Sequence, residues 1–152
     1  GAVVAVNALG DIFDWKTGKK AAGLLGEDRK TFLDSEEEML KINQVIENKF
    51  AGNTTIGAVF TNAEFNKTKL CKFAGMAHDG YARSIRPVHT SADGDSIYAV
   101  SLGDVKADQD MVGTLAARVV SQAILRAVEH AESAYGFPAA KELKKALDEK
   151  QA

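Results

Sequence analysis

The 152-residue sequence has few features of the specialised protein classes. Its one cysteine, Cys71, cannot form an intramolecular disulfide, so packing must stabilise the fold, as is usual in a reducing cytoplasm. Its 2 prolines and 13 glycines are too few for a collagenous or low-complexity chain. A net charge of -2 gives no long-range attraction for nucleic acid or anionic lipid. We therefore expect one globular domain that does not bind nucleic acid.

Long hydrophobic runs are also missing. No uninterrupted apolar run approaches the roughly 18–20 residues of a membrane-spanning helix, and the first residues lack the basic, apolar and cleavage-site order of a secretory signal. We expect no membrane partner and a cytoplasmic location. The sequence starts at Gly1, without a Met, and runs directly into an apolar stretch, which predicts that it is part of a longer protein.

Three Val-, Ile- or Thr-rich segments predict β-strands, at residues 2–8, 54–61 and 96–102. We expect the first strand to be buried on both faces, because it is almost wholly apolar. Residues 10–35 show no sustained period and predict a loop, with a hairpin around residues 16–19.

Four segments predict helices, at residues 35–50, 66–86, 111–131 and 139–150. Ser35 and Glu38 have the spacing of a capping box, Asn66 suits the N-cap of the second helix, and Pro87 should stop that helix. The alternation of strands and helices predicts an α/β fold with helices layered on a sheet.

The segment at residues 52–57 (GNTTIG) has two interpretations. By pattern alone, a turn that leads into a strand is favoured, because Gly and Asn suit turns and Thr suits strands. The alternative is that the bond between Asn53 and Thr54 is cut. Thr54 would then carry a hydroxyl nucleophile and a free α-amine, whose ordinary pKa of about 7.7–8.0 suits a general base.

The polar segment at residues 89–96 (HTSADGDS) contains two carboxylates, Asp93 and Asp95. If the strand has already begun there, both point to one face and could orient an ammonium group or share a proton. The pattern alone favours an Asp-Gly turn. An EF-hand is excluded, because the acidic residues do not follow its spacing. The three histidines and Cys71 lack the spacing of metal ligands, so we expect no metal and no cofactor.

Four stretches together resemble a known family: residues 4–11 (VAVNALGD), 53–59 (NTTIGAV), 77–83 (AHDGYAR) and 87–95 (PVHTSADGD). They are similar, in order and spacing, to the self-processing aminopeptidases and amidases typified by DmpA, which include β-peptidyl aminopeptidases and nylon-oligomer hydrolases. The resemblance covers about 110 residues.

The resemblance implies a precursor that cuts itself into two associated subunits within a four-layer α/β/β/α sandwich. Residues 1–53 would be the carboxy-terminal end of the large subunit and residues 54–152 the small subunit. Thr54 would be the nucleophile and Asn53 the last residue before the cut. Asn7 would help to hold the oxyanion, and Asp93 and Asp95 would orient the nucleophile and its ammonium group.

The implied reaction is hydrolysis of a small peptide or amide through an acyl-enzyme on Thr54. The family's catalytic lysine belongs to a segment that precedes Gly1, so we expect the missing amino-terminal part to be a partner and this chain alone to be inactive. We also expect a homo-oligomer of heterodimers. Two alternatives remain: an acyltransferase of the ornithine acetyltransferase type, or an inactive, unprocessed fragment.

Overall fold

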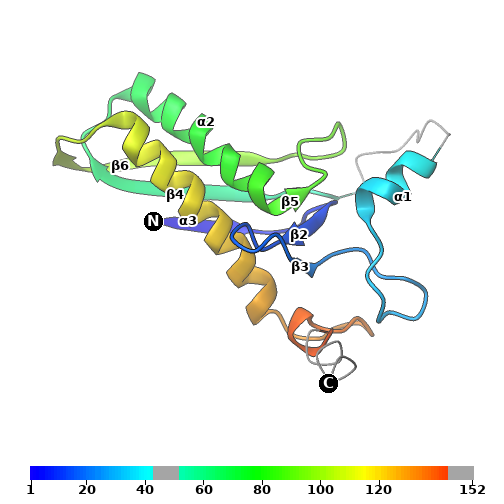
Figure 1. Ribbon diagram of the computed structural model, residues 1–152. Helices are drawn as coiled ribbons and strands as arrows, with labels where there is room; N and C mark the ends of the chain where they lie inside the picture. Colours follow the sequence, from blue (N-terminus) through cyan, green and yellow to red (C-terminus); the bar gives the residue numbers. More distant parts are fainter. Residues whose placement is uncertain (43–51, 144–152) are drawn as a thin grey trace.

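The computed structural model describes residues 1–42 and 52–143, and its main feature is a three-stranded sheet with two long helices on one face (Figure 1). The strand order is β1-β4-β6. The central strand β4 (Ile56–Ala63) pairs antiparallel with β1 (Ala2–Ala5) and parallel with β6 (Ser96–Val105). The predicted α/β class is confirmed.

The helices α2 (Lys67–Ser84) and α3 (Gln109–His130) lie side by side on this sheet (Figure 1). They approach closely at Gly80, where a Cβ atom would lie only 2.6 Å from the carbonyl oxygen of Ala117. The residues buried between the sheet and the helices include Val59, Tyr81, Ile85, Val120 and Ile124.

The opposite face of the sheet is exposed and largely apolar within the described residues. The register places Val3, Ile56, Phe60 and Tyr98 on it. Val3 is 67% exposed, so the expectation of a first strand buried on both faces is wrong. Only alternate residues of β1 point toward the helices. The main sheet and its two helices thus form one sheet layer and one helical layer, and the four-layer sandwich stays a prediction.

A second, smaller sheet lies in the segment that was expected to be a loop. Its order is β3-β2-β5, with β2 (Asp11–Phe13), β3 (Lys20–Ala22) and β5 (Ile85–Arg86). The predicted hairpin is present between β2 and β3, and its turn is stabilised by Asp14, whose carboxylate accepts hydrogen bonds from the Lys16 amide and the Thr17 hydroxyl. Strands of three residues are too short to show an alternating pattern.

The first helix, α1 (Ser35–Lys41), begins one residue away from the predicted cap. Asp34, not Ser35, is the N-cap, and its carboxylate accepts hydrogen bonds from the Glu36 and Glu37 amides. The Ser35 hydroxyl instead donates to Asp11. The helix ends at Lys41 with an extended cap at Ile42, earlier than predicted; residues 43–50 of the expected helix lie outside the described residues.

The two long helices begin at side chains that cap their first turns. Asn66 caps α2 by accepting from the Lys69 amide, as predicted, and α2 ends with the extended residue Ile85 shortly before Pro87. Asp108 caps α3.

By length and composition alone α3 could cross a membrane, but helices in protein cores share those properties, and one side of α3 packs on α2. Of the predicted last helix, residues 140–143 are helical and residues 144–150 lie outside the described part.

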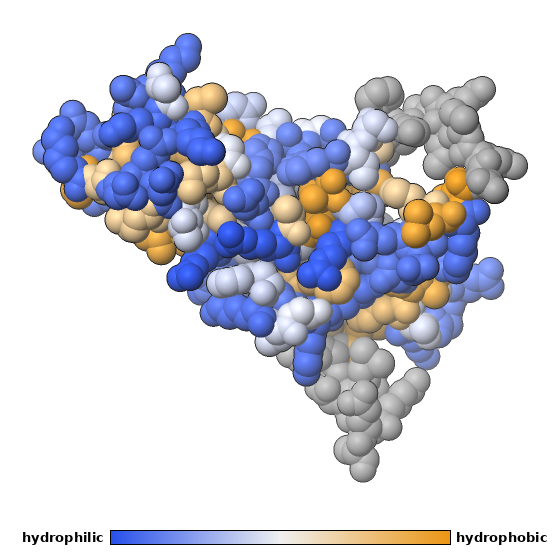
Figure 2. Space-filling model, turned by 45° about the horizontal axis from the view of Figure 1, so that its top comes forward, coloured by the Kyte–Doolittle hydropathy of each residue, from blue (hydrophilic) through white to orange (hydrophobic). Residues whose placement is uncertain are grey.

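The surface seen in Figure 2 is mostly hydrophilic, with hydrophobic residues in separate patches. Charged side chains fall on the outer sides of α2 and α3, because the apolar stripes of these helices face the sheet. This packing fixes the positions of the loops that precede β4 and β6, where the polar residues singled out in the sequence lie.

Candidate active site

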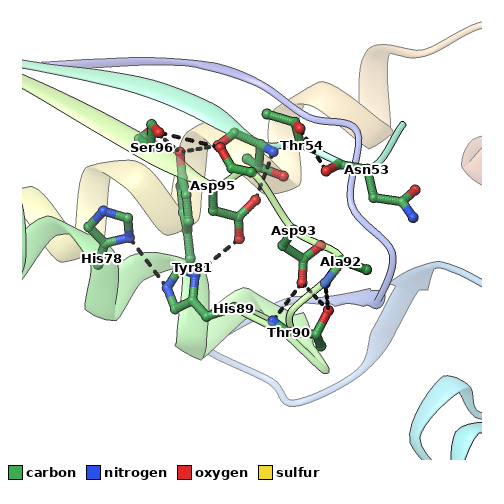
Figure 3. Close-up of polar contacts among 12 residues, drawn as sticks. Asn53, Thr54, His78, Tyr81, His89, Thr90, Ala92, Asp93, Asp95 and Ser96 are labelled. Atoms are coloured by element: carbon green, nitrogen blue, oxygen red, sulfur yellow. Dashed lines mark hydrogen bonds and ion pairs between the residues drawn. The ribbon is translucent and has the colours of Figure 1, made fainter. Parts of the chain in front are cut away.

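The candidate site lies where the two parallel strands β4 and β6 begin, so their preceding loops meet at one edge of the sheet (Figure 3). Asn53 and Asp93 form an isolated parallel bridge. The Gly94 amide donates to the Asn53 carbonyl oxygen at 3.2 Å, and the Ser96 amide donates to the Thr55 carbonyl oxygen at 3.1 Å. The two segments singled out in the sequence are therefore brought together.

Thr54 is held from both of its sides. Its amide donates to the main-chain carbonyl of Asn7 at 2.9 Å, and its hydroxyl donates to the carbonyl oxygen of Asn53 at 2.6 Å. Gly94 leaves room for this hydroxyl, because a Cβ atom on Gly94 would lie 2.8 Å from Thr54 Oγ1. The threonine hydroxyl thus lies beside the peptide bond that precedes it.

The Asn53 carbonyl oxygen accepts two hydrogen bonds, from the Thr54 hydroxyl and from the Gly94 amide. Donors at a carbonyl oxygen draw electron density from the carbonyl carbon and stabilise negative charge that develops on the oxygen during attack. The carbonyl of the Asn53–Thr54 bond therefore has two donors at its oxygen.

Asn7 follows β1 and contacts the same loop. Its side-chain Nδ2 donates to the Gly52 carbonyl oxygen, while its main-chain oxygen accepts from the Thr54 amide. In the intact chain, its amide donor is therefore directed at the carbonyl one residue before Asn53. Asn7 is at the site, and its role in holding an oxyanion remains a prediction.

The two carboxylates bind different partners. Asp95 Oδ1 accepts from the Thr55 amide at 2.8 Å, and Oδ2 lies 3.1 Å from His89 Nδ1. Asp93 Oδ2 accepts from the amide and the hydroxyl of Thr90, both at 2.8 Å. The strand has not begun at these residues, because β6 begins only at Ser96, so the condition for placing both carboxylates on one face is not met. Asp93 shapes the turn, and Asp95 supports the residue after Thr54.

Two residues of α2, His78 and Tyr81, were not predicted at the site. His78 Nδ1 lies 3.3 Å from His89 Nε2, and the Tyr81 hydroxyl donates to the carbonyl oxygen of Thr55 at 3.3 Å and of Ser96 at 3.2 Å. Both lie in the stretch 77–83 that carries the family resemblance, and their spacing of three residues places both side chains on one helical face.

Burial governs the ionisation of these α2 side chains. It lowers the pKa of His78, and the nearby charge of His89 lowers it further. It also raises the pKa of the Tyr81 hydroxyl, with a smaller contribution from the charge of Asp95. Both side chains are therefore neutral at pH 7, and Tyr81 acts here as a hydrogen-bond donor.

Metal ligation finds no support in the described part of the chain, residues 1–42 and 52–143. No group of three or more His, Cys, Asp or Glu side chains in it is placed to hold a metal ion. At Thr54, the hydroxyl lies beside a carbonyl oxygen that also accepts from the Gly94 amide, and the Asp95 carboxylate binds the next residue.

Comparison with known proteins identifies a family. A family model described as Peptidase family S58 matches residues 1–141. An uncharacterized aminopeptidase of Mycobacterium leprae is 35% identical over 153 residues, which cover 91% of this chain and 42% of the relative. A 6-aminohexanoate-oligomer endohydrolase of Agromyces is 32% identical over 143 residues, which cover 83% of this chain and 39% of the relative.

A further 6-aminohexanoate-oligomer endohydrolase, from Kocuria, is 30% identical over 149 residues, 84% of this chain and 40% of the relative. The chain thus spans less than half the length of these curated relatives. The family model extends over almost the whole chain, and it includes all the site residues described above. The resemblance seen in the sequence is confirmed, and the chain belongs to peptidase family S58, the DmpA family.

Proposed function

We propose that this chain is part of a peptide or amide hydrolase whose nucleophile, Thr54, is exposed by self-cleavage of the Asn53–Thr54 bond. Membership of peptidase family S58 supports a hydrolase, as do the aminopeptidase and oligomer-endohydrolase names of the relatives. The observation that carries the proposed mechanism is the Thr54 hydroxyl, which lies 2.6 Å from the Asn53 carbonyl oxygen while the Gly94 amide donates to that same oxygen.

Self-cleavage proceeds by attack of Thr54 Oγ1 on the Asn53 carbonyl carbon. The bond between Oγ1 and this carbon forms, the carbon–nitrogen bond to Thr54 breaks, and the hydroxyl proton passes to the departing nitrogen. The products are an ester and a free α-amine on Thr54. Water then hydrolyses the ester, which gives a carboxylate on Asn53 and restores the Thr54 hydroxyl. The Gly94 amide stabilises the oxyanion formed during the attack.

Substrate hydrolysis repeats this chemistry with an external amide. The α-amine of Thr54 takes the proton of the hydroxyl as Oγ1 attacks the substrate carbonyl, and returns it to the leaving amine. An acyl-threonine and a free amine result. Water then releases the acyl group as a carboxylic acid, and Thr54 is regenerated.

The surrounding residues position these groups. Asp95 fixes the Thr55 amide, and Asp93 fixes the turn that carries Gly94. Once the bond is cut, both carboxylates can accept hydrogen bonds from the new amino terminus and so orient it, while its neutral amine form acts as the base. Release of the peptide before Thr54 also frees Asn7 from Gly52, so that its side-chain amide can turn toward a substrate oxyanion.

The proposed substrates are small peptides or linear amides, in keeping with the names of the relatives. The remainder of a longer protein is the proposed partner of this chain, since the relatives are more than twice as long as the matched region. The exposed apolar face of the sheet gives such a partner a large surface on which to pack.

The test is Thr54→Ala in the complete protein. We expect the wild type to give two polypeptides, of which the smaller starts at Thr54 by amino-terminal sequencing and hydrolyses an aminoacyl amide. Thr54→Ala should remain one polypeptide without hydrolysis. Thr114→Ala is the matched control, because this threonine lies on α3 and its hydroxyl donates only within that helix, to Asp110.

If Thr54→Ala is still cut before residue 54, the nucleophile is another group and the proposal is wrong. Turnover that depends on an added acceptor amine would indicate the acyltransferase alternative.

A further inference from the structure

The imidazole of His89 links the carboxylate of Asp95 to helix α2. Its Nδ1 lies 3.1 Å from Asp95 Oδ2, and its Nε2 lies 3.3 Å from His78 Nδ1 (Figure 3). The His89 ring also lies against Tyr81, with 5.9 Å between centroids. The His89 ring is therefore contacted by Asp95 at Nδ1, by His78 at Nε2 and by the ring of Tyr81.

The chemistry of the partners fixes the protons on these rings. A carboxylate only accepts hydrogen bonds, so Nδ1 of His89 carries a proton and donates to Asp95. While both histidines are neutral, Nε2 of His89 accepts from Nδ1–H of His78. The low pKa of His78 keeps that ring neutral under neutral conditions, which avoids two facing cations. The other charged or titratable groups around this pair are Asp95, Tyr81 and Asp79.

The second oxygen of Asp95 acts next to the bond proposed to be cut. Oδ1 accepts from the Thr55 amide at 2.8 Å, and Thr55 follows Thr54 directly. Rotation of the Asp95 carboxylate would therefore weaken its hydrogen bond with the Thr55 amide, next to the proposed nucleophile Thr54. The donor on His89 opposes this rotation, because it binds the other oxygen of the same carboxylate.

The backbone of His89 also indicates a specific requirement at this position. His89 has φ 57°, a left-handed conformation that is uncommon for residues other than glycine and in which Asn, Asp and His are enriched. A left-handed histidine persists where surrounding interactions hold it, and such residues cluster at functional sites. Here the interactions are those with Asp95 and His78.

We propose that His89 is a positioning residue for self-cleavage at Asn53–Thr54: its Nδ1–H orients Asp95, whose other oxygen fixes the Thr55 amide, and His78 holds the far edge of the ring. This inference rests on the proposed function. It adds two residues to the machinery, neither of which touches the reacting atoms.

The test compares His89→Asn with His89→Gly in the complete protein. Both residues accept a left-handed backbone, so neither variant is strained by φ. Asn places its side-chain amide donor at the same distance along the side chain as Nδ1, whereas Gly removes the donor. We expect His89→Gly to slow cleavage roughly tenfold to a hundredfold, the range seen when a positioning contact is lost. His89→Asn should cleave within a few-fold of the wild type.

A second measurement reports on the contact itself. Hydrogen exchange of the Thr55 amide, followed by NMR in a Thr54→Ala background that cannot cleave through this hydroxyl, should be faster in His89→Gly than in His89→Asn. His130→Gln is the control for loss of a histidine, because His130 lies at the exposed end of α3, where its Nδ1 lies 3.0 Å from the Arg126 carbonyl oxygen. It should change neither cleavage nor exchange.

Equal cleavage rates in His89→Gly and His89→Asn would overturn the inference, whether both match the wild type or both are slow, because the Nδ1 donor would then make no difference. So would equal exchange of the Thr55 amide in the two variants. The proposed function fails separately. The proposed function would fail if cleavage did not depend on Thr54 or if the wild type were not cleaved. Either result would also remove the proposed role of His89 in cleavage.

Discussion

Two nearly buried carboxylates, Asp11 and Asp95, serve different purposes in the same fold. The side chain of Asp11 is 1% exposed and that of Asp95 is 5% exposed. Burial of a carboxylate is costly unless hydrogen bonds and charges compensate it, so both must be paired. The identity of the partners distinguishes them.

Asp11 is fully bound by permanent donors. It accepts from the Lys20 ammonium, the Leu24 amide, and both the amide and the hydroxyl of Ser35. These contacts join β2, β3, the segment after β3 and the start of α1. Burial alone would raise the pKa of Asp11, but the Lys20 ammonium and the amides of Ser35 and Leu24 outweigh it, so the pKa is lowered.

Asp95 has fewer partners than Asp11, and one of them is a histidine. It accepts from the Thr55 amide and faces His89, which in turn contacts His78. A carboxylate bound by a lysine and backbone amides organises structure, whereas one between a histidine and the residue after a candidate nucleophile can influence reactivity. Burial by itself therefore does not identify a functional carboxylate.

The largest difference should appear on truncating Asp11. Asp11→Ala leaves the partly buried Lys20 ammonium without its counter-charge, and we expect a loss of about 3–5 kcal/mol in the free energy of unfolding. Urea denaturation measures it. Asp104→Ala, at an exposed position on β6, is the control and should change stability by less than about 0.5 kcal/mol. A similar small change for Asp11→Ala would contradict the structural role.

A glycine lies against a key side chain in each of the two regions, and substitution of Gly23 tests the region of Asp11. Gly23 has φ 154°, and a Cβ atom there would lie 2.0 Å from Asp11 Oδ1. Gly23→Ala should therefore displace the carboxylate and cost about 1–3 kcal/mol of stability, measured by urea denaturation. Unchanged stability would show that Asp11 has more freedom than its hydrogen bonds indicate.

Gly94→Ala is the counterpart at the candidate site. Its Cβ atom would lie 2.8 Å from Thr54 Oγ1, so the hydroxyl must turn away from the Asn53 carbonyl. We expect self-cleavage to slow roughly tenfold or more, with a loss of stability under about 1 kcal/mol, because a single hydroxyl can rotate. Densitometry of cleavage after synthesis checks the rate. A stability loss as large as that of Gly23→Ala, with normal cleavage, would show that Gly94 serves the fold and not the candidate site.

Asp95→Asn should separate rate from stability at the carboxylate itself. The side chain keeps an oxygen for the Thr55 amide but loses the charge that pairs with His89. We expect slower cleavage, roughly tenfold, and a stability loss of about 1 kcal/mol or less. Cleavage and hydrolysis at wild-type rates would remove Asp95 from the site.

The smallest effect should be a pH dependence of the free energy of unfolding, with one pH range that reports on His78 and a lower one that reports on Asp11. The pKa of His78 is lowered in the folded protein, so the unfolded chain binds a proton more readily, and stability falls as the pH drops below about 6.5. The pKa of Asp11 is also lowered, so its contribution is lost only as the pH falls below about 3.9. Urea titrations at a series of pH values should lose the decrease in the His78 range in His78→Asn; an unchanged decrease there would contradict the assignment.

Much of the fold could be predicted from periodicity and caps, but the small sheet could not. The long helices α2 and α3 and the central strand follow from apolar spacing over eight or more residues. In β2 and β3, three residues carry no such pattern. Asp11 gains its role from donors up to 24 residues away in the sequence, which no local pattern indicates.

The candidate site was predictable where residues are neighbours in the sequence. Thr54 and the Asp93–Asp95 segment were singled out, and the parallel pairing of β4 with β6 brings them together. The link from Asp95 through His89 to His78 depends on how the loop after α2 folds back on that helix, which local patterns do not encode.

The central position of β4 determines what a cut at Asn53–Thr54 would leave behind. The piece before the cut contributes β1, and the piece after it contributes β4 and β6, so the ladder from Ala2–Val59 to Ala5–Ile56 crosses between the two products. A nicked molecule would thus stay assembled through a shared sheet, and gel filtration would show one species where a denaturing gel shows two bands.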